Sequence, residues 1–163
     1  VPGIRAIGDL VATPWLAHVA HHEALIAVND IAGLAPHPLD LDRIPMCIYS
    51  SPEVARVGLT EAVAVARGLD VKTATFPFGA LAKGLIEGGG EGAVKVIADG
   101  STGELLGLHI VGPRATELIM EGTMALALEA TIEDLAHTIH PHPTLSEGIM
   151  EAALALLDRP VHM

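Results

Sequence analysis

The chain has 163 residues, of which 50% are hydrophobic, so it has the size and the apolar content of one ordinary globular domain. Nine Lys and Arg against twenty Asp and Glu give a formal net charge of −11, which would repel nucleic acid and anionic membrane surfaces. Polar or turn residues interrupt every apolar stretch well short of the roughly 18 residues that a membrane span needs. We therefore expect a soluble protein with neither of these partners.

The first part of the chain, residues 1–43, is predicted to hold a strand, a helix and a linker. Residues 1–9 have the pattern of a last strand that arrives at a Gly-Asp corner. A helix is predicted to begin at Thr13-Pro14, because a cap followed by proline is a typical helix start, and small or apolar residues recur at helical spacing as far as Gly33. The proline-rich and charged composition of 34–43 indicates a linker.

The second part, residues 44–163, is predicted to adopt an α+β fold. A hairpin turn at 99–103 makes its last two strands antiparallel. A short helix is predicted between Thr60 and Gly68, and three more helices are predicted over 115–157. The helices follow five predicted strands, which are rich in Val, Ile, Leu or Thr and lie at Pro45 to Tyr49, Ala55 to Leu59, Asp70 to Phe76, Ala93 to Ala98 and Glu104 to Val111.

Few self-contained chemical motifs are present. The glycine-rich run at 88–92 lacks the spacing and the strand-to-helix context of a phosphate-binding turn, so a hairpin loop is predicted there. A histidine metal site is a second hypothesis, but no acidic or thiol ligand stands at a usual spacing, and exposed helix surface is the simpler interpretation. The histidines that prompt this hypothesis form two groups: His18, His21 and His22, and His137, His140 and His142.

The segment from His142 to Glu147 is the most informative one. Thr144 and Glu147 fit a capping box, in which the threonine hydroxyl binds the N–H of Glu147 and the carboxylate reaches back to the cap. Pro143 holds His142 just before this helix, with the Glu147 carboxylate one turn away. A carboxylate that binds one imidazole nitrogen leaves the other nitrogen free as a base near neutral pH. The helix cap and the His-Glu dyad are therefore two interpretations that compete for one side chain.

The residues also resemble a known family. The stretch from Ile44 to Glu61 is similar to the opening of the C-terminal interface domain of the pyridine nucleotide-disulfide oxidoreductases. Within that family the similarity is greatest to the dihydrolipoamide dehydrogenases, whose ending pairs two histidines around one residue before Pro-Thr-Leu-Ser-Glu. Residues 1–33 resemble the segment that closes the FAD-binding domain. The match continues through Phe76 to Phe78, Gly92 to Asp99, Gly107 to Gly112 and His140 to Glu147.

The resemblance implies roles for individual residues. His142 would be the base that takes a thiol proton from dihydrolipoamide, and Glu147 would orient it. Asp9 would bond the ribityl chain of FAD. The backbone beside the flavin ring would be that of Trp15, Leu16, Ala17 and His18, with Trp15 standing where the family usually has Met. The loop at 78–84 departs from the usual family sequence, which affects only a surface loop.

The resemblance also implies what this chain lacks. The dinucleotide fingerprint, the redox cysteine pair and the NAD domain of the family are not among these residues, and Cys47 is expected to be a core residue of a strand. FAD and NAD would therefore both depend on N-terminal domains outside this sequence. We expect the 163-residue chain alone to be inactive.

The implied partners are a second copy of the chain, whose site would receive His142, and a protein that carries the lipoyl group. That protein would belong to a 2-oxo acid dehydrogenase complex or to the glycine cleavage system. The sequence starts at Val1 with no signal or transit peptide, which predicts a cytoplasmic location. The alternative from another class is a free-standing, non-catalytic dimerisation or assembly module, in which changing His142 would have no effect.

Overall fold

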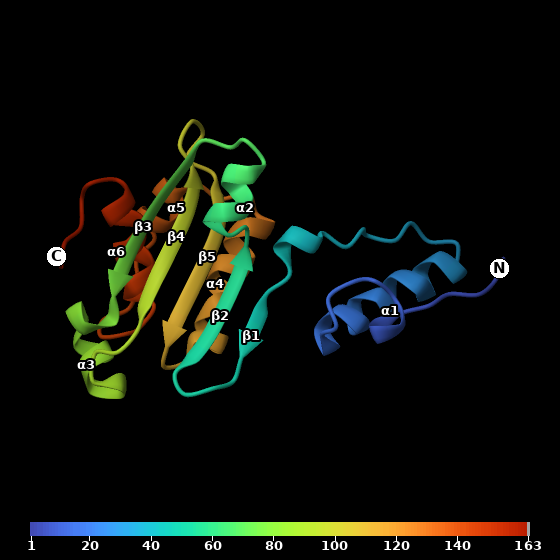
Figure 1. Cartoon of the computed structure of the whole chain (residues 1–163), viewed down its shortest axis with the longest axis horizontal. Helices are drawn as coiled ribbons and strands as arrows, with labels where there is room; N and C mark the ends of the chain where they lie inside the picture. Colours follow the sequence, from blue (N-terminus) through green and yellow to red (C-terminus); the bar gives the residue numbers. More distant parts are fainter. Residues whose placement is uncertain (163) are drawn as a thin grey trace. The chain divides into compact units, whose positions relative to one another are not determined.

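The computed structural model describes residues 1–162, which form two compact units. The first unit is Val1–Ile44, and the second begins at Pro45. The second unit is an α+β structure built on one five-stranded antiparallel sheet, as the sequence predicts (Figure 1). Among the described residues, no helix is both long and apolar enough to cross a membrane.

The first unit consists of a 3-10 turn, η1 (Gly8–Leu10), a helix, α1 (Ala17–Ile31), and a second short turn, η2 (Leu41–Arg43). The predicted strand over 1–9 is wrong, because no strand within the described residues 1–162 offers this segment backbone partners. The helix is confirmed, but it begins at Ala17 rather than at Pro14. Its predicted cap, Thr13, instead donates its hydroxyl to the Glu23 carboxylate at 2.5 Å.

The five predicted strands of the second unit are confirmed, with small differences at their ends. Their order across the sheet is β1-β2-β5-β4-β3, and every neighbouring pair is antiparallel. The hairpin between β4 and β5 turns through 99–103, where Asp99 accepts hydrogen bonds from the N–H groups of Ser101 and Thr102. The strands are β1 (Met46–Ile48), β2 (Glu53–Gly58), β3 (Val71–Pro77), β4 (Ala93–Asp99) and β5 (Leu105–Gly112).

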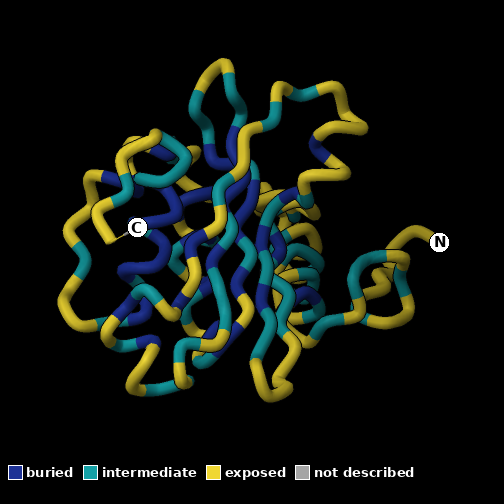
Figure 2. The backbone as a smooth tube through the Cα atoms, turned by 60° about the vertical axis from the view of Figure 1, so that its left-hand side comes forward, coloured by how far each residue is buried: buried dark blue, intermediate teal, exposed yellow. Residues whose placement is uncertain are grey.

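One face of this sheet is apolar and carries the core. Because side chains alternate between the two faces of a strand, residues paired across strands form rows on one side. One such row runs through Phe76, Val94, Ile110 and Ala55, all of which are buried. The buried positions are concentrated in the strands and the helix turns that face them (Figure 2).

Helices cover the apolar face. Helix α4 packs on β2 and β5, and α6 packs on β3 and β4, with α5 beside α6 (Figure 1). The break between α4 and α5 at Thr131 and the break before α6 agree with the prediction, as does the short helix α2, which is capped by Thr60. These helices are α2 (Glu61–Ala66), α4 (Ala115–Ala127), α5 (Ile132–His137) and α6 (Glu147–Leu156).

The connection from β3 to β4 contains elements that the sequence prediction missed. A 3-10 turn, η3 (Phe78–Ala80), leads into helix α3 (Ala82–Gly88). The glycine run therefore does not form a plain hairpin loop: Gly89 ends the helix in the left-handed conformation, with φ of 60°. Glycine adopts this conformation without the steric cost that a Cβ would add.

Phe78 joins this connection to the start of α6. Its ring is fully buried and lies so close to three glycines that a Cβ added to any of them would be within about 3 Å of a ring atom. These glycines are Gly92, Gly112 and Gly148. Gly148 is the second residue of α6, so the packing of Phe78 positions the helix end that carries Glu147.

Candidate functional site

His142 and Glu147 form a hydrogen-bonded pair at the start of α6. The Nδ1 atom of His142 lies 2.9 Å from Oε1 of Glu147, while Oε2 of the same carboxylate accepts the backbone N–H of Thr144 at 2.8 Å. The two interpretations of Glu147 therefore do not compete, because each uses a different oxygen. The His142 side chain is 68% exposed and that of Glu147 is 8% exposed. A buried carboxylate thus holds an accessible imidazole.

The capping box predicted for Thr144 and Glu147 is only half formed. The carboxylate does reach back to the Thr144 N–H, but the Thr144 hydroxyl donates to the Pro141 carbonyl at 2.7 Å instead of binding the N–H of Glu147. Helix α6 begins at Glu147, and Ser146 at the N-cap makes no side-chain cap bond. The hydroxyl instead closes the turn that carries His142.

Glu147 is held in its charged form. Burial by itself raises the pKa of this carboxyl, but hydrogen bonds from the Thr144 N–H and the His142 ring outweigh burial and lower the pKa below its ordinary value. An ionised carboxylate accepts hydrogen bonds and donates none, so Nδ1 of His142 carries the proton of the pair. The Nε2 atom is then the nitrogen that accepts a proton.

The same turn holds a second histidine-carboxylate pair. Nε2 of His140 is 2.7 Å from Oε1 of Glu121 on α4, and Nδ1 is 2.9 Å from the carbonyl oxygen of Thr138. The His140 side chain is 4% exposed. The hydrogen bond to the Glu121 carboxylate raises the pKa of His140, against the effect of burial. Sequence spacing gave no signal for this pair, because its partners stand 19 positions apart.

Glu151 is a third carboxylate on α6 that the sequence prediction did not single out. It is fully buried, one turn after Glu147, and its oxygens accept the backbone N–H groups of Val161 and His162. The His162 ring also lies 2.6 Å from Oε1. These contacts satisfy a charge that would otherwise be costly to bury, and they attach the C-terminal residues to the helix.

The structure does not assemble a histidine metal site. No cluster of three or more His, Cys, Asp or Glu side chains within residues 1–162 could hold a metal ion. His137 lies on α5 and makes an exposed contact with Glu133 at 3.4 Å, whereas His140 and His142 each have a carboxylate partner of their own. The second hypothesis from the sequence thus has no ligand set in the described part of the chain.

Cys47 lies on β1, half-buried and packed against the core. Burial raises the pKa of its thiol, and the nearby carboxylates of Glu53 and Glu117 raise it further. A raised pKa leaves little of the nucleophilic thiolate at neutral pH, so the environment of Cys47 is that of a structural thiol.

The remaining predicted site residues lie in the first unit. Asp9 is in the turn η1, exposed and without a hydrogen-bond partner among residues 1–162, and Trp15 is 72% exposed. Leu16 is the N-cap of α1, and it has no side chain that could cap the helix. Helix α1 therefore begins without a side-chain cap.

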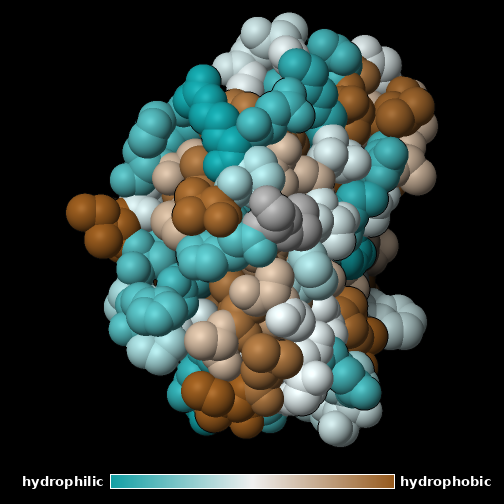
Figure 3. All heavy atoms as spheres, turned by 90° about the vertical axis from the view of Figure 1, so that its left-hand side faces the viewer, coloured by the Kyte–Doolittle hydropathy of each residue, from teal (hydrophilic) through white to brown (hydrophobic). Residues whose placement is uncertain are grey.

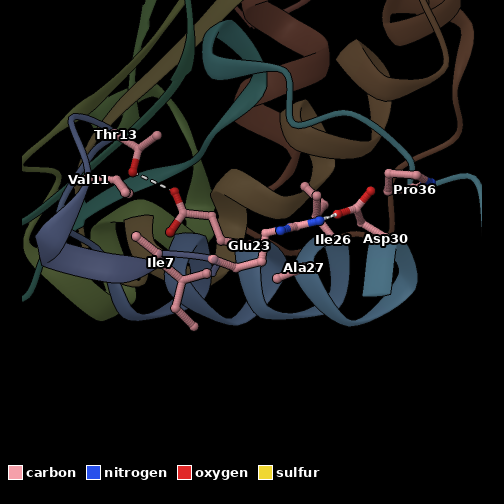
Figure 4. A pocket seen from close by; sticks show the side chains of 10 residues that line it. Ile7, Val11, Thr13, Glu23, Ile26, Ala27, Asp30 and Pro36 are labelled. Atoms are coloured by element: carbon pink, nitrogen blue, oxygen red, sulfur yellow. Dashed lines mark hydrogen bonds and ion pairs between the residues drawn. The ribbon is translucent and has the colours of Figure 1, made fainter. Parts of the chain in front are cut away.

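A groove of about 470 Å³ runs along α1 in the same unit (Figure 4). Its walls are largely apolar, with Ile7 and Ile26 among the lining residues, and Glu23 binds Thr13 at one end. At the other end Arg5 is paired with Asp30. Val19 and Ile44 are the buried residues among 1–44, so this unit exposes most of its apolar side chains.

The second unit has the fold of a reductase dimerisation domain, with a His-Glu pair at the start of its last helix. Residues 44–153 match the family model described as pyridine nucleotide-disulphide oxidoreductase, dimerisation domain. The chain belongs to this family of oxidoreductases.

Individual relatives agree with this assignment. The chain is 53% identical to a dihydrolipoyl dehydrogenase of Bacillus subtilis over 98% of its own length, and 49% identical to that of Thermus scotoductus over 99%. It spans about a third of these relatives, namely 34% and 35% of their lengths. Among solved structures, LpdA from Mycobacterium tuberculosis superposes with a TM-score of 0.87 at 32% identity, covering 94% of this chain and 34% of that one.

Proposed function

We propose that this chain is the C-terminal portion of an FAD-dependent dihydrolipoyl dehydrogenase, which oxidises dihydrolipoyl groups and passes their electrons through a disulfide and FAD to NAD. In this proposal residues 1–43 are the end of the FAD-binding domain and a linker, and 44–163 are the dimerisation domain. The hydrogen bond between His142 and Glu147 carries the proposal, since it presents a base at the surface. The identity to bacterial and plant dihydrolipoyl dehydrogenases supports it.

His142 would act on the thiol of the substrate. Its Nε2 atom takes the proton from the S–H group, and the thiolate that remains is the form that attacks a disulfide. Glu147 fixes the ring orientation through Nδ1 and stabilises the imidazolium that results. The pair is therefore suited to thiol-disulfide exchange near neutral pH.

The first unit has groups that fit a flavin. When bound, FAD would accept the electron pair from the dithiol. The unpartnered Asp9 carboxylate can accept hydrogen bonds from hydroxyl groups such as those of a ribityl chain. By the family resemblance, the backbone of Trp15, Leu16, Ala17 and His18, where α1 begins, would lie beside the flavin ring. NAD would bind outside this chain, in a domain that the family resemblance places before it.

The first test is the activity of the chain alone. The chain contributes one part of the flavin contacts and a single cysteine, so it should not reduce NAD⁺ with dihydrolipoamide, whereas the complete polypeptide should. The measurement is NADH formation by both proteins at equal molar concentration. Ordinary turnover by the 163-residue chain would contradict the proposal that FAD and NAD binding depend on domains outside this chain. A complete polypeptide that is stable, dimeric and inactive would favour the assembly module instead.

We propose that the second unit forms a homodimer through its apolar surface. Met120 and Met124 lie four positions apart on one face of α4, and Leu128, the C-cap residue, follows four positions later; each is more than half exposed. The next exposed apolar residue, Ile139, lies just before the His142 turn. Exposed apolar surface of this kind is typical of an interface. The same assembly would bring the His142 of each subunit to its partner.

A charge in this surface tests the proposed contact. Met124→Glu should raise the dissociation constant of the dimer by about tenfold or more, because the carboxylate would have to lose its water in an apolar contact. Sedimentation of the wild-type and variant chains measures the change. Leu85→Glu is the matched control, because the Leu85 side chain is 58% exposed and that of Met124 is 57% exposed. Leu85 lies on α3. Hydrophobic side chains gather at the lower end of the face shown in Figure 3, where α3 lies. Equal dissociation by both variants would contradict α4 as the contact.

We further propose that the complete enzyme serves a lipoyl-bearing 2-oxo acid dehydrogenase complex or the glycine cleavage system, and that it works in the cytoplasm. The location is supported by the higher identity to a bacterial relative, 53%, than to the mitochondrial enzyme of Arabidopsis thaliana, 42%. Binding of the complete protein to purified lipoyl-bearing complexes of each kind would distinguish the two partners.

A further inference from the structure

The turn that carries His142 is attached to α4 by the buried ring of His140. Its two hydrogen bonds point in opposite directions, to the Glu121 carboxylate on α4 and to the Thr138 carbonyl at the end of α5. Two residues further on, His142 is exposed and its ring is hydrogen-bonded to Glu147. The more buried histidine thus connects the end of α5, where the turn begins, to α4.

The geometry determines the protonation of this ring. A carbonyl oxygen accepts hydrogen bonds and never donates them, so Nδ1 of His140 must carry a proton. An ionised carboxylate is also an acceptor, so Nε2 must carry a second proton. Both bonds, at 2.9 and 2.7 Å, are therefore complete only when the ring is an imidazolium paired with the Glu121 carboxylate.

We propose that His140, held as an imidazolium between Glu121 and the Thr138 carbonyl, is a positioning residue that fixes the His142 turn against α4. The inference rests on the proposed function of His142 as a base. The carboxylates that act on His140 are those of Glu121 on α4 and Glu147 on α6. Each negative charge favours the charged ring, so the bridge and the His142–Glu147 pair support each other.

The bridge has a defined pH range. Because the pKa of His140 is raised in the folded protein, its contribution is complete below the ordinary histidine value and is lost as the pH rises through the raised pKa. Loss of the proton breaks one of the two hydrogen bonds and frees the turn. Misplacing a catalytic group by about 1 Å can lower the rate by as much as 10²-fold. We therefore expect kcat to decline on the alkaline side of its pH profile as the His140 bridge is lost.

Three substitutions test the proposal in the complete protein. Glu121→Ala removes the bridge, and we expect the kcat for dihydrolipoamide oxidation to fall about 10- to 100-fold with little change in KM. In Glu121→Gln the side-chain amide N–H can donate to Nε2 of the neutral His140 ring, so the bridge forms without the second ring proton. We therefore expect kcat to be retained and the alkaline part of its pH profile to differ from that of wild type. Glu133→Gln removes the exposed partner of His137 and is the matched control, expected to behave as wild type.

Nuclear magnetic resonance of the 163-residue chain makes the test independent of activity, and the titration of His140 in Glu121→Gln also makes it independent of the folding of Glu121→Ala. The ring nitrogens of His140 should titrate at lower pH in Glu121→Gln than in wild type, and Glu133→Gln should leave that titration unchanged. In Glu121→Ala the Thr144 amide, which donates to Glu147, should exchange with solvent faster than in wild type.

Either of two results would overturn the proposal: an unchanged His140 titration in Glu121→Gln, or a kcat in folded Glu121→Ala equal to that of wild type. A complete wild-type protein that fails to oxidise dihydrolipoamide would contradict the proposed function instead, and the amide exchange of Thr144 would then decide whether His140 positions the turn.

Discussion

Replacing His142 with glutamine in the complete protein is expected to slow the oxidation of a dihydrolipoyl thiol by about 10²- to 10⁴-fold, the usual contribution of a general base. Glutamine can still donate to the Glu147 carboxylate, but its amide takes up no proton near neutral pH. The step to measure is the reduction of the enzyme by dihydrolipoamide under rapid mixing, since steady-state turnover also includes later steps. The substitution is at an exposed side chain, so stability should stay within about 0.5 kcal/mol of wild type.

His137→Gln provides the control for this experiment. His137 is also exposed and near a carboxylate, Glu133, but it lies on α5 and its contact at 3.4 Å is longer than a normal hydrogen bond. Its replacement should leave the rate of reduction unchanged. A loss of less than threefold in His142→Gln, or an equal loss in both variants, would remove His142 from the role of base.

Truncating Phe78 to alanine is expected to lower the free energy of unfolding by about 3–5 kcal/mol, the range for large aromatic residues in a packed core. The ring is fully buried and is surrounded by Gly92, Gly112 and Gly148, whose backbones leave little side-chain volume to fill the space. Urea denaturation followed by circular dichroism measures the loss. Because Gly148 is the second residue of α6, the His142 turn should also become less ordered.

An exposed residue of the same connection gives the comparison. Leu85→Ala on α3 removes a side chain that is 58% exposed, and its effect should remain within about 1 kcal/mol. Similar changes in the free energy of unfolding for both substitutions would contradict the inference that the buried Phe78 ring is important for packing. An unfolded Phe78→Ala chain at room temperature would agree with the upper part of the expected range.

Much of the second unit could be predicted from the sequence because its signals are local. Short β-branched segments separated by turn residues locate the five strands, and the cap at Thr60 and the breaks in the last 50 residues locate helices. Helix α3 escaped prediction because its seven residues include two glycines, Gly84 and Gly88. A Cβ at Gly84 would lie 2.0 Å from the Phe78 carbonyl oxygen, so packing requires a glycine at this position. Helix propensity alone would disfavour glycine there.

The candidate site was predictable only in part. His142 and Glu147 are five positions apart, so the sequence could suggest their pairing, although it could not show that the two carboxylate oxygens serve different partners. Glu121 and Glu151 could not be found in this way, since their partners depend on how α4 and the C-terminal residues pack. The predicted strand at 1–9 failed for a related reason: a strand needs a neighbour, and residues 1–162 provide none there.

The scarcity of aromatic residues has a practical consequence for optical work on this chain. The sole tryptophan, Trp15, lies in the first unit, and the sole tyrosine, Tyr49, lies in the second. Both are strongly exposed, at 72% and 82%, so neither changes its surroundings much when the core opens. Intrinsic fluorescence should therefore change little while the sheet unfolds, and any change in tryptophan emission on adding flavin would report on the first unit.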